Sequence, residues 1–541
     1  MNRFCMWVIV FGAMLFFIPW IGDPYMTPRL LFVALGAAPL LFRVSNRRSS
    51  LEVPMLGLLL AATVSAAFAQ DRGYAMFGAY QFPADSLLAI AVYLCVLLAG
   101  ARSGMDARGI TRIIVYLSIP MSAYAIFQRF WTDPLLYEAL PTGVRVVSTQ
   151  GGPVFLGAVL AISAICALYL AKQRERLGWA ALAFILPAMW FTLTRGALVA
   201  TAVGGAFIFR SAPLLILPAL VFLPRFISVA ADSARIEVWK IALRVFMDNP
   251  VIGYGTGNFY IAFRRYVSWR YHDIMDNAIA VQAHAHNDIL HVLATMGIVG
   301  LAAYLVLAAS CVRVARESRD RPLLLGILAA YFVLSNFNPV TTSVFVMLAL
   351  IFGAASAKTE PVASRSILPE LACLAVAFFT AQLTWASYHF ARGAAAYRRD
   401  VMASAYHFNR AAQLNPWEMV YTCRQVDSLV DLIPISSSDS VKPLAGTARE
   451  LASRALRRHP MDSYAHELYG KTILVAHMAG TKVDPREAMA EFNSAQGLAP
   501  TFEALMWRRR KTAEALGDED QIEFADKDIA DLRATLAPGG I

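Results

Sequence analysis

Charged residues are scarce in this sequence: Asp, Glu, Lys and Arg together fill only 16% of its 541 positions. A soluble globular domain is nearer one quarter charged. Hydrophobic residues fill 58% of the positions instead. They gather in runs close to the roughly 20 residues that a helix needs to cross a bilayer. The composition therefore excludes a soluble enzyme, a disordered chain and a DNA-binding domain, and it indicates a helical membrane protein.

Cysteine is also rare, with six in the whole chain. Five of them stand in apolar runs, where a thiol packs as a small hydrophobic group, and Cys423 stands alone in the polar C-terminal part. No pair has the Cys-x-x-Cys spacing of a metal site, and no disulfide framework is available. The class of secreted, disulfide-rich proteins is therefore excluded.

The apolar runs predict an all-α, polytopic transmembrane bundle of about 12–13 spans. The expected spans are 4–20, 29–42, 52–69, 82–100, 111–129, 153–171, 178–194, 196–209, 212–230, 290–312, 323–337, 343–356 and 367–388. Lysine and arginine cluster in every second short loop, for example at Arg47, Arg108 and Arg316. Cytoplasmic loops carry such an excess of positive charge, so the alternation explains the net charge of +10 without a nucleic-acid partner.

Two segments interrupt the pattern of spans. Residues 231–289 form a long loop on the side opposite the basic loops, within an expected membrane domain of residues 1–390. Residues 391–541 are less apolar, and we expect them to form a separate helical domain on the same outer side as the long loop. The chain therefore divides into a membrane part and an outer part.

A weak repeat marks the C-terminal domain. An alanine precedes a proline at the same spacing in three places: Ala411 and Pro416, Ala455 and Pro460, and Ala495 and Pro500. The pattern is typical of tetratricopeptide helix pairs, in which the alanine allows close helix contact and the proline ends the second helix. Such arrays bind protein segments, so the domain would recruit a protein partner. The alternative is an ordinary helical domain.

Candidate functional residues stand at the outer ends of spans. Arg145 precedes the span 153–171, Arg195 stands at the end of another span, and Arg235 and Trp239 open the long loop. A proton-coupled transporter would place acids or histidines near mid-membrane instead. The positions favour a site at the outer membrane surface. The alternatives are arginines that snorkel to the interface and an amphipathic interfacial helix over 235–246.

The end of the long loop carries the remaining candidates. His284, His286, Asn287, Asp288 and His291 lie within eight positions, just before the span 290–312 and at its start. On a helix, His284 and His286 would face different sides, and no further ligand spacing is evident, so we expect no metal. The three glycines earlier in the loop favour a flexible turn over a phosphate loop, because neither a strand nor a Gly-Lys-Ser/Thr motif flanks them.

Several arginines and one histidine on a single side of the membrane match the needs of glycosyl transfer from a lipid diphosphate. Guanidinium groups can hold the diphosphate and stabilise its charge as it leaves. An imidazole can deprotonate the acceptor hydroxyl near neutral pH. Neither a metal nor another cofactor is then required.

Three segments together resemble the O-antigen ligase and polymerase superfamily of bacterial inner-membrane glycosyltransferases. They are TLTRGALVA, ARIEVWKIALRVFMDNPVIGYGTGNF and HAHNDILHVLATMGIVG. The resemblance is strongest over 140–305. It implies an undecaprenyl-diphosphate-linked glycan as donor, a periplasmic active site and no metal. By motif, Arg195 and Arg235 would bind the diphosphate, His286 would be the base, and Arg145 would help to hold the donor.

The other candidates would support substrate binding: Trp239, His284, Asn287, Asp288 and His291. The acceptor stays open between a lipid, such as the lipid A core, and a growing polysaccharide. A protein O-oligosaccharyltransferase is a second interpretation. A non-enzymatic polysaccharide transporter or assembly scaffold is a third.

Overall fold

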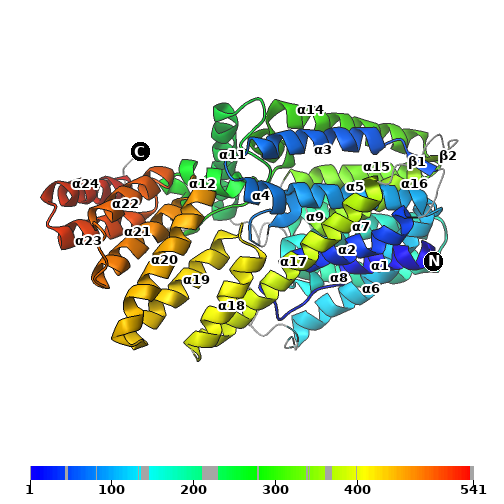
Figure 1. The fold of residues 1–541 in the computed structure, drawn as a ribbon. Helices are drawn as coiled ribbons and strands as arrows, with labels where there is room; N and C mark the ends of the chain where they lie inside the picture. The colour runs from blue at the N-terminus through cyan, green and yellow to red at the C-terminus, as the bar shows by residue number, and fades with distance from the viewer. Residues whose placement is uncertain are drawn as a thin grey trace.

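The computed structural model describes residues 2–42, 47–80, 82–131, 133, 135, 145–209, 229–276, 280–336, 339, 341–359, 368–397 and 399–536. Over these ranges the chain is helical apart from one small sheet and its loops, which confirms the all-α fold class. Figure 1 shows a bundle of long, roughly aligned helices on one side and a row of C-terminal helices on the other. The long loop lies where the two parts meet.

The expected spans correspond to helices of the bundle. They are α1 (Asn2–Met14), α2 (Met26–Leu41), α3 (Glu52–Ala67), α5 (Leu87–Arg102), α6 (Ala107–Phe130), α7 (Pro153–Lys172), α8 (Arg176–Thr192), α9 (Arg195–Ala206), α14 (Asp288–Glu317), α15 (Arg321–Ser335), α16 (Thr342–Ala355) and α17 (Leu368–Ala396). The expected span 212–230 lies almost wholly outside the described residues.

The expected spans are longer than many of the helices. Within the described ranges, four helices are long and apolar enough to cross a membrane: α6, α7, α14 and most of α17. Most of the other bundle helices are apolar but shorter, with 10–17 residues. The apolar runs overestimate helix length because apolar composition continues into the connections; the run 4–20, for example, extends past the end of α1 at Met14. Of the about 12–13 expected spans, twelve therefore correspond to bundle helices within the described residues, and four of these helices have the length and composition of a membrane-crossing helix.

Small residues let the bundle helices approach closely. A side chain at Gly100 of α5 would meet the backbone of Leu350 on α16, and one at Gly204 of α9 would meet the backbone of Gly326 on α15. Close backbone approach at small residues is a common mode of helix association in membranes. Helix α7 is enclosed by this packing, with 89% of its most apolar window buried, whereas the corresponding window of α14 is only 28% buried. Helix α14 thus borders the bundle.

A short sheet closes one end of the bundle. Strand β1 (Arg47–Ser49) pairs antiparallel with β2 (Ala357–Thr359), near the N-terminus and far from the C-terminal helices. Its residues Arg47, Arg48 and Lys358 come from loops that the charge pattern assigns to the cytoplasm. The orientation of the bundle in a membrane remains a prediction.

The long loop contains helices of its own: α11 (Val229–Asp248), α12 (Phe259–Tyr266) and α13 (Trp269–Met275). The glycine segment between α11 and α12 is not the flexible turn that we expected. The amides of Tyr254 and Gly255 donate to the carbonyls of Ala294 and Thr295 at 3.0 and 2.8 Å. Helix α14 is broken at Gly297, where φ is +63°, and a side chain there would meet the backbone of Val251. The segment is packed against this break.

The C-terminal part consists of seven helices: α18 (Val401–Leu414), α19 (Met419–Leu432), α20 (Ser438–Arg458), α21 (Ser463–Met478), α22 (Arg486–Leu498), α23 (Glu503–Leu516) and α24 (Glu519–Leu536). Ala411, Ala455 and Ala495 are buried near the ends of α18, α20 and α22. The tetratricopeptide assignment itself stays a prediction. Helix α17 continues to Ala396, so it crosses the expected domain boundary at residue 390.

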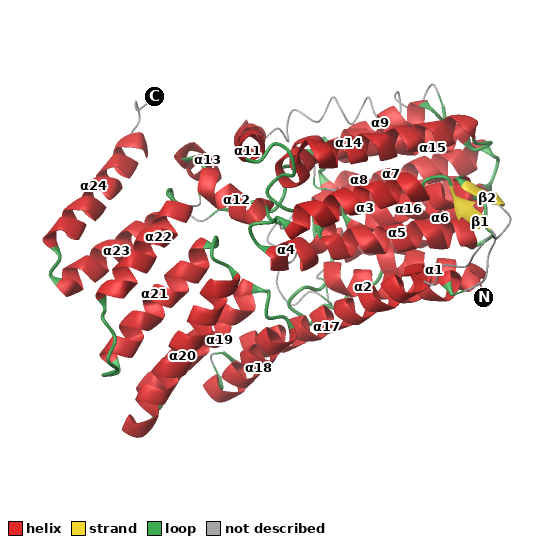
Figure 2. Cartoon of the chain, turned by 45° about the horizontal axis from the view of Figure 1, so that its top comes forward, coloured by secondary structure: helices red, strands yellow, loops and turns green. Residues whose placement is uncertain are grey.

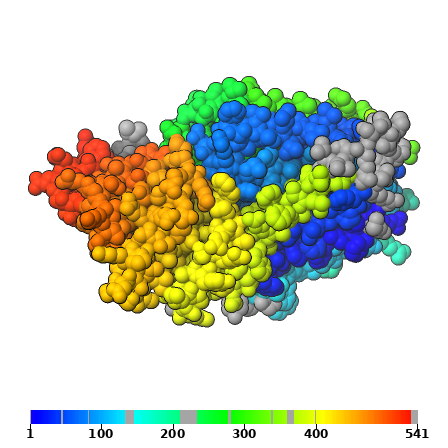
Figure 3. Space-filling view, in the orientation of Figure 1, coloured from blue at the N-terminus to red at the C-terminus, as the bar shows by residue number. Residues whose placement is uncertain are grey.

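Two buried ion pairs join the C-terminal helices to the rest of the molecule. His459 pairs with Asp71, which caps the short helix α4 (Arg72–Phe77), and Arg264 of α12 pairs with Asp462 at 2.8 Å. All four side chains are at most 2% exposed. Figures 2 and 3 show the C-terminal helices continuing directly from the bundle and the long loop. The two parts are therefore docked through matched charges.

Candidate active site

Arg145 lies against the junction of α8 and α9. Its Nε donates to the carbonyl of Thr192 at 2.9 Å, and its Nη2 donates to the hydroxyl of Thr194 at 3.3 Å. Arg195 follows Thr194 directly and is the first residue of α9. The Thr-Leu-Thr-Arg segment thus binds the Arg145 side chain and carries Arg195 directly after one of its partners.

A buried arginine supports the loop that carries Arg145. Arg29 of α2 is fully buried, and it donates to the carbonyl of Phe16 at 3.1 Å and to the side chain of Gln150 at 3.2 Å. It also contacts the carbonyl of Thr149. These bonds hold the short helix η2 (Ser148–Gln150) that follows Arg145. Arg29 was missed because it stands at the edge of an expected span and belongs to no motif.

Helix α11 carries Arg235 and Trp239, so this part of the long loop is helical. Its residues Val238, Ile241, Ala242 and Val245 are buried, whereas Ile236 is 50% exposed. The helix is therefore amphipathic and docked on one face, rather than lying free at an interface. The indole nitrogen of Trp239 is buried, and it has no hydrogen-bond partner within the described part of the chain.

His286 lies in a tight turn just before α14. Its φ is +54°, an uncommon conformation for a residue with a side chain. The backbone amide of His286 donates to Nδ1 of His284 at 3.0 Å, which holds the turn. The expectation that the two histidines occupy a helix was wrong, because Asn287 caps α14 and the helix begins only at Asp288.

A chain of hydrogen bonds orients the His286 ring. Its Nε2 lies 3.1 Å from the side-chain oxygen of Gln282, and the amide nitrogen of Gln282 donates to the hydroxyl of Tyr271 at 2.8 Å. A ring that donates from Nε2 carries its free lone pair on Nδ1. Gln282 thus orients the His286 ring, as a third group orients the base in many catalytic sites. Gln282 was missed because a single glutamine carries no sequence signal.

The remaining histidines form a second polar group beside this turn. His291 Nε2 lies 2.8 Å from a carboxylate oxygen of Asp85, and the rings of His284 and His291 stack with centroids 4.0 Å apart. Asp288 accepts from the hydroxyl of Tyr331 at 2.7 Å. Asp85 comes from the connection before α5, some 200 residues away in the sequence. Only the folded chain reveals this partner.

The electrostatic surroundings of the site are cationic. Burial and the charges of Arg235 and His291 lower the pKa of His286 to about 4. Burial and Arg235 also lower the pKa of Arg145, and burial holds the pKa of His284 well below its usual value. Arg235 therefore lies within electrostatic reach of both Arg145 and His286. Burial and these nearby charges therefore favour the uncharged form of the His286 imidazole.

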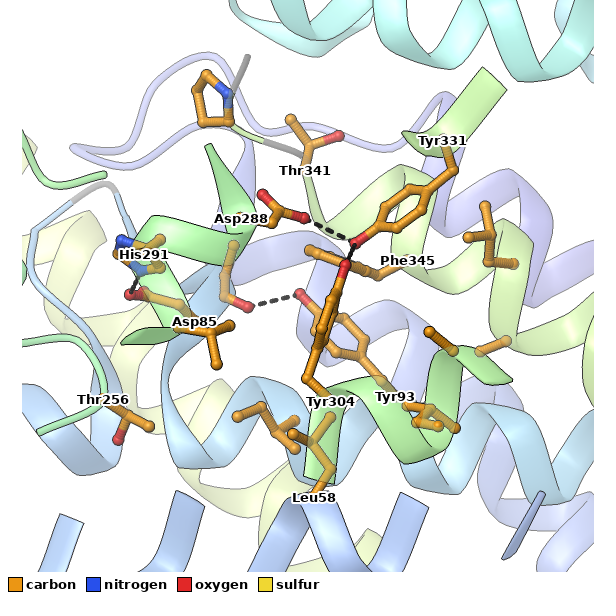
Figure 4. Close-up of a pocket in the computed structure, with 18 of the residues that line it drawn as sticks. Leu58, Asp85, Tyr93, Thr256, Asp288, His291, Tyr304, Tyr331, Thr341 and Phe345 are labelled. Atoms are coloured by element: carbon orange, nitrogen blue, oxygen red, sulfur yellow. Dashed lines mark hydrogen bonds and ion pairs between the residues drawn. The ribbon is translucent and has the colours of Figure 1, made fainter. Parts of the chain in front are cut away.

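A cavity of about 250 Å³ lies beside the histidines, among α3, α5, α14, α15 and α16. Figure 4 shows its polar end, where Asp85, His291, Asp288 and Tyr331 gather. Its remaining wall is mainly apolar and aromatic. Of the predicted site residues, His284, Asp288 and His291 line this cavity, whereas the arginines and His286 do not.

The structure thus separates the predicted residues into two groups. Arg235 is electrostatically coupled to both Arg145 and His286, Arg195 follows Thr194, and His284, Asp288 and His291 form the cavity group. Asn287 serves as a helix cap and also donates to Asn336 at 3.1 Å. Among the residues that the structure describes, no group of three or more His, Cys, Asp or Glu side chains is placed to hold a metal.

A sequence model of one known family, described as O-Antigen ligase, matches residues 140–305. The matched segment runs from the loop before Arg145 into α14 and includes every predicted site residue. It supports an O-antigen ligase-type function in general, and together with the apolar helices it indicates a membrane protein. No curated protein matches the chain.

Proposed function

We propose that the protein is a membrane glycosyltransferase of the O-antigen ligase and polymerase type, which transfers a glycan from an undecaprenyl-diphosphate-linked donor to an acceptor hydroxyl at the periplasmic face of the inner membrane. The match of residues 140–305 to the O-Antigen ligase family model supports this proposal. The structural observation that supports this proposal is the electrostatic coupling of Arg235 to both Arg145 and His286, which come from three distant segments.

The arginines would bind the diphosphate. Like charges held close together lower each other's pKa, as Arg235 does to Arg145, and such a cluster gains most when an anion enters it. Guanidinium groups bind phosphate oxygens in pairs of parallel hydrogen bonds and keep their charge at all relevant pH values. Arg195 adds a third cation at the first turn of α9, where the helix N-terminus also favours negative charge.

His286 would act as the base. Nδ1 takes the proton from the acceptor hydroxyl, the acceptor oxygen forms a bond to the anomeric carbon, and the bond from that carbon to the diphosphate oxygen breaks. The electron pair leaves with undecaprenyl diphosphate, whose charge the arginines stabilise. The bound anion would offset the charge of Arg235, so the pKa of His286 would rise from about 4 toward the range of an effective base when the donor is present.

The C-terminal helices would bind a protein partner. A groove of about 660 Å³ lies between α21 and α23, and Trp507, Arg508 and Lys511 stand on its wall. Tetratricopeptide arrays bind extended segments in such grooves. This partner would locate the enzyme within an assembly, while the membrane part carries out the transfer.

A reconstituted transfer assay tests the proposal. The full chain in proteoliposomes is given an undecaprenyl-diphosphate glycan and candidate acceptors: lipid A core, a growing polysaccharide or a protein. The wild-type chain should form product with one acceptor class, and Arg235→Ala should reduce the rate by about 100-fold or more. Arg244→Ala is the matched control, because Arg244 lies exposed on the same helix.

Each outcome separates the interpretations. Product on lipid A core indicates a ligase, product on polysaccharide a polymerase, and product on protein an oligosaccharyltransferase. Absence of product with all three acceptors would favour the transporter or scaffold. Equal rates for Arg235→Ala and Arg244→Ala would reject the role of Arg235 in binding the diphosphate.

A further inference from the structure

Two buried polar atoms at the same end of the cavity lack hydrogen-bond partners within the described part of the chain. They are one carboxylate oxygen of Asp288, Oδ1, and the hydroxyl oxygen of Thr341, Oγ1. Asp288 is 6% exposed and Thr341 is 1% exposed. A buried polar atom without a partner costs about 1–3 kcal/mol, so two of them on residues that line one cavity require an explanation.

The contacts of Asp288 show which hydrogen bond its Oδ1 lacks. Its other oxygen accepts from the hydroxyl of Tyr331 at 2.7 Å, and Tyr331 in turn lies 3.2 Å from the hydroxyl of Tyr304. His284 Nε2 is 3.5 Å from Oδ1 and does not complete a hydrogen bond. Figure 4 shows Asp288, Tyr331 and Thr341 together at the top of the view. Asp288 Oδ1 needs a donor, and Thr341 can donate or accept.

The wall of the cavity limits the class of ligand. Its side chains below the polar end are mainly apolar or aromatic, including Leu58, Leu97, Leu307 and Phe345, and no lysine or arginine among the described residues lines it. Two carboxylates, Asp85 and Asp288, stand at the polar end. A phosphate would meet negative charge there without a cation, so this cavity differs in kind from the arginine cluster.

We propose that the cavity binds an uncharged amphiphile whose hydroxyl group bridges Asp288 and Thr341. The ligand hydroxyl donates to Asp288 Oδ1 and accepts from Thr341 Oγ1, which satisfies both atoms. Its alkyl or prenyl chain lies along the apolar wall. A hydroxyl makes both bonds without bringing a charge into an apolar space, whereas an ammonium group would have to be desolvated. The ligand class is a lipid with a sugar or other polyol head.

The site is defined by binding alone, so it stands or falls independently of the proposed glycosyl transfer. Ligands of this kind usually fill a mostly apolar pocket with a few fixed polar groups. The rings of Tyr93 and Tyr331 contact the ring of Phe345 in tilted and edge-to-face geometry, and such rings supply apolar surfaces of the kind that sugar rings contact. The volume of about 250 Å³ limits the ligand to one small head with the start of its chain and excludes a whole glycan.

Photolabelling tests the site. The full chain in lipid nanodiscs is labelled with an alkyl glucoside that carries a diazirine in its chain, and the labelled peptides are mapped by mass spectrometry. Labelling is expected on the cavity segments of α14 to α16. Excess decyl glucoside should displace it, whereas decyl phosphate and decyltrimethylammonium should not.

Matched variants locate the hydroxyl contact. Thr341→Val keeps the shape of the side chain and removes its hydroxyl, and it should reduce saturable labelling by about fivefold or more. Thr341→Ser should restore it. Ser163→Ala removes another buried, unpartnered hydroxyl that does not line the cavity, so it should leave labelling unchanged. Ala349→Leu, which fills the cavity, should abolish labelling.

Three results would overturn the proposal. The first is equal labelling of the wild-type chain, Thr341→Val and Ala349→Leu. The second is displacement by decyl phosphate or decyltrimethylammonium as effective as that by decyl glucoside. The third is a loss of labelling in Thr341→Ser as large as in Thr341→Val, because that would show a role of the methyl group rather than of the hydroxyl.

Discussion

His286 and His459 are two imidazoles in opposite electrostatic surroundings. Burial together with Arg235 and His291 lowers the pKa of His286 to about 4. Burial also opposes the charge of His459, but the carboxylate of Asp71 outweighs it, and the pKa of His459 is raised. Both residues stand where segments distant in sequence meet. The sign of the nearby charge therefore lowers the pKa of one imidazole and raises the pKa of the other.

The charged residues near the two imidazoles also differ in how they are arranged. Around His459, the pairs Asp71–His459 and Arg264–Asp462 match each charge with an opposite one. Around His286, the charges of Arg145 and Arg235 act against each other. Matched, buried charges join two parts of a protein, whereas like charges held together favour an anionic ligand. We therefore expect substitutions around His286 to reduce the rate of transfer, and substitutions around His459 to reduce the stability of the fold.

The largest effect is expected at His286. His286→Ala should lower the transfer rate by about 10² to 10⁴-fold, because the base is lost, and should leave the melting temperature close to that of the wild-type chain. His459→Ala is the matched change at the other imidazole, and it should lower the melting temperature first. If both variants lost transfer to a similar extent and kept their stability, the assignment of His286 to transfer and of His459 to stability would be contradicted.

The buried ion pair should carry the largest effect on stability. Arg264→Met leaves Asp462 as an unpaired buried charge, which typically costs about 3–5 kcal/mol. The expected result is a clear loss of thermal stability and faster proteolysis of the C-terminal helices. Arg265→Met, at the exposed neighbouring position on α12, should change little. Equal melting curves for the two variants would show that the pair does not hold the parts together.

A smaller effect on transfer is expected from the residue that orients the base. Gln282→Leu removes the acceptor for His286 Nε2, so the ring loses its fixed tautomer and orientation. The rate should fall by about 10-fold, mainly in kcat, and Gln282→Asn should not recover it because the shorter amide cannot reach. A change in KM alone would point to a role in binding rather than in orientation.

The smallest expected effect is a pH dependence of docking. The pKa of His459 is raised, so its stabilising charge is fully present below the unfolded pKa of about 6.5 and is lost as pH rises through the folded pKa. Burial raises the pKa of Glu418 to about 8, so this neutral carboxyl also favours the folded state at lower pH. The melting temperature should therefore decrease from pH 6 to pH 9, by about 2–4 °C per kcal/mol. His459→Gln should flatten this dependence, and a rise in stability with pH would contradict it.

Much of the fold followed from the sequence. Apolar runs and basic loops predicted the helical bundle, and the spacing of alanines and prolines predicted helix ends near Ala411, Ala455 and Ala495. Helix lengths were overestimated, because apolar residues continue into buried connections. The glycine segment was misjudged as flexible, because its packing against the break at Gly297 depends on a contact between segments distant in sequence.

The candidate site was predictable only where motifs carry it. Arg145, Arg195, Arg235 and His286 stand in segments with recognisable patterns, and the match to the O-antigen ligase family covers all four. Arg29, Asp85 and Gln282 act through contacts across the fold, and such contacts leave no local pattern. The same holds for Thr341, whose significance depends on the cavity beside it.

The most direct test of the account is the titration of His286 with and without a diphosphate. The full chain with labelled histidine is titrated by NMR in nanodiscs, in the absence and presence of undecaprenyl diphosphate, with His459 as the internal reference. The account predicts a pKa of about 4 for His286 in the free protein, a rise of about one unit or more on binding, and no change at His459. An unchanged His286, or an ordinary pKa near 6.5 in the free protein, would contradict the central claim that Arg235 and its neighbours form an anion site around a neutral base.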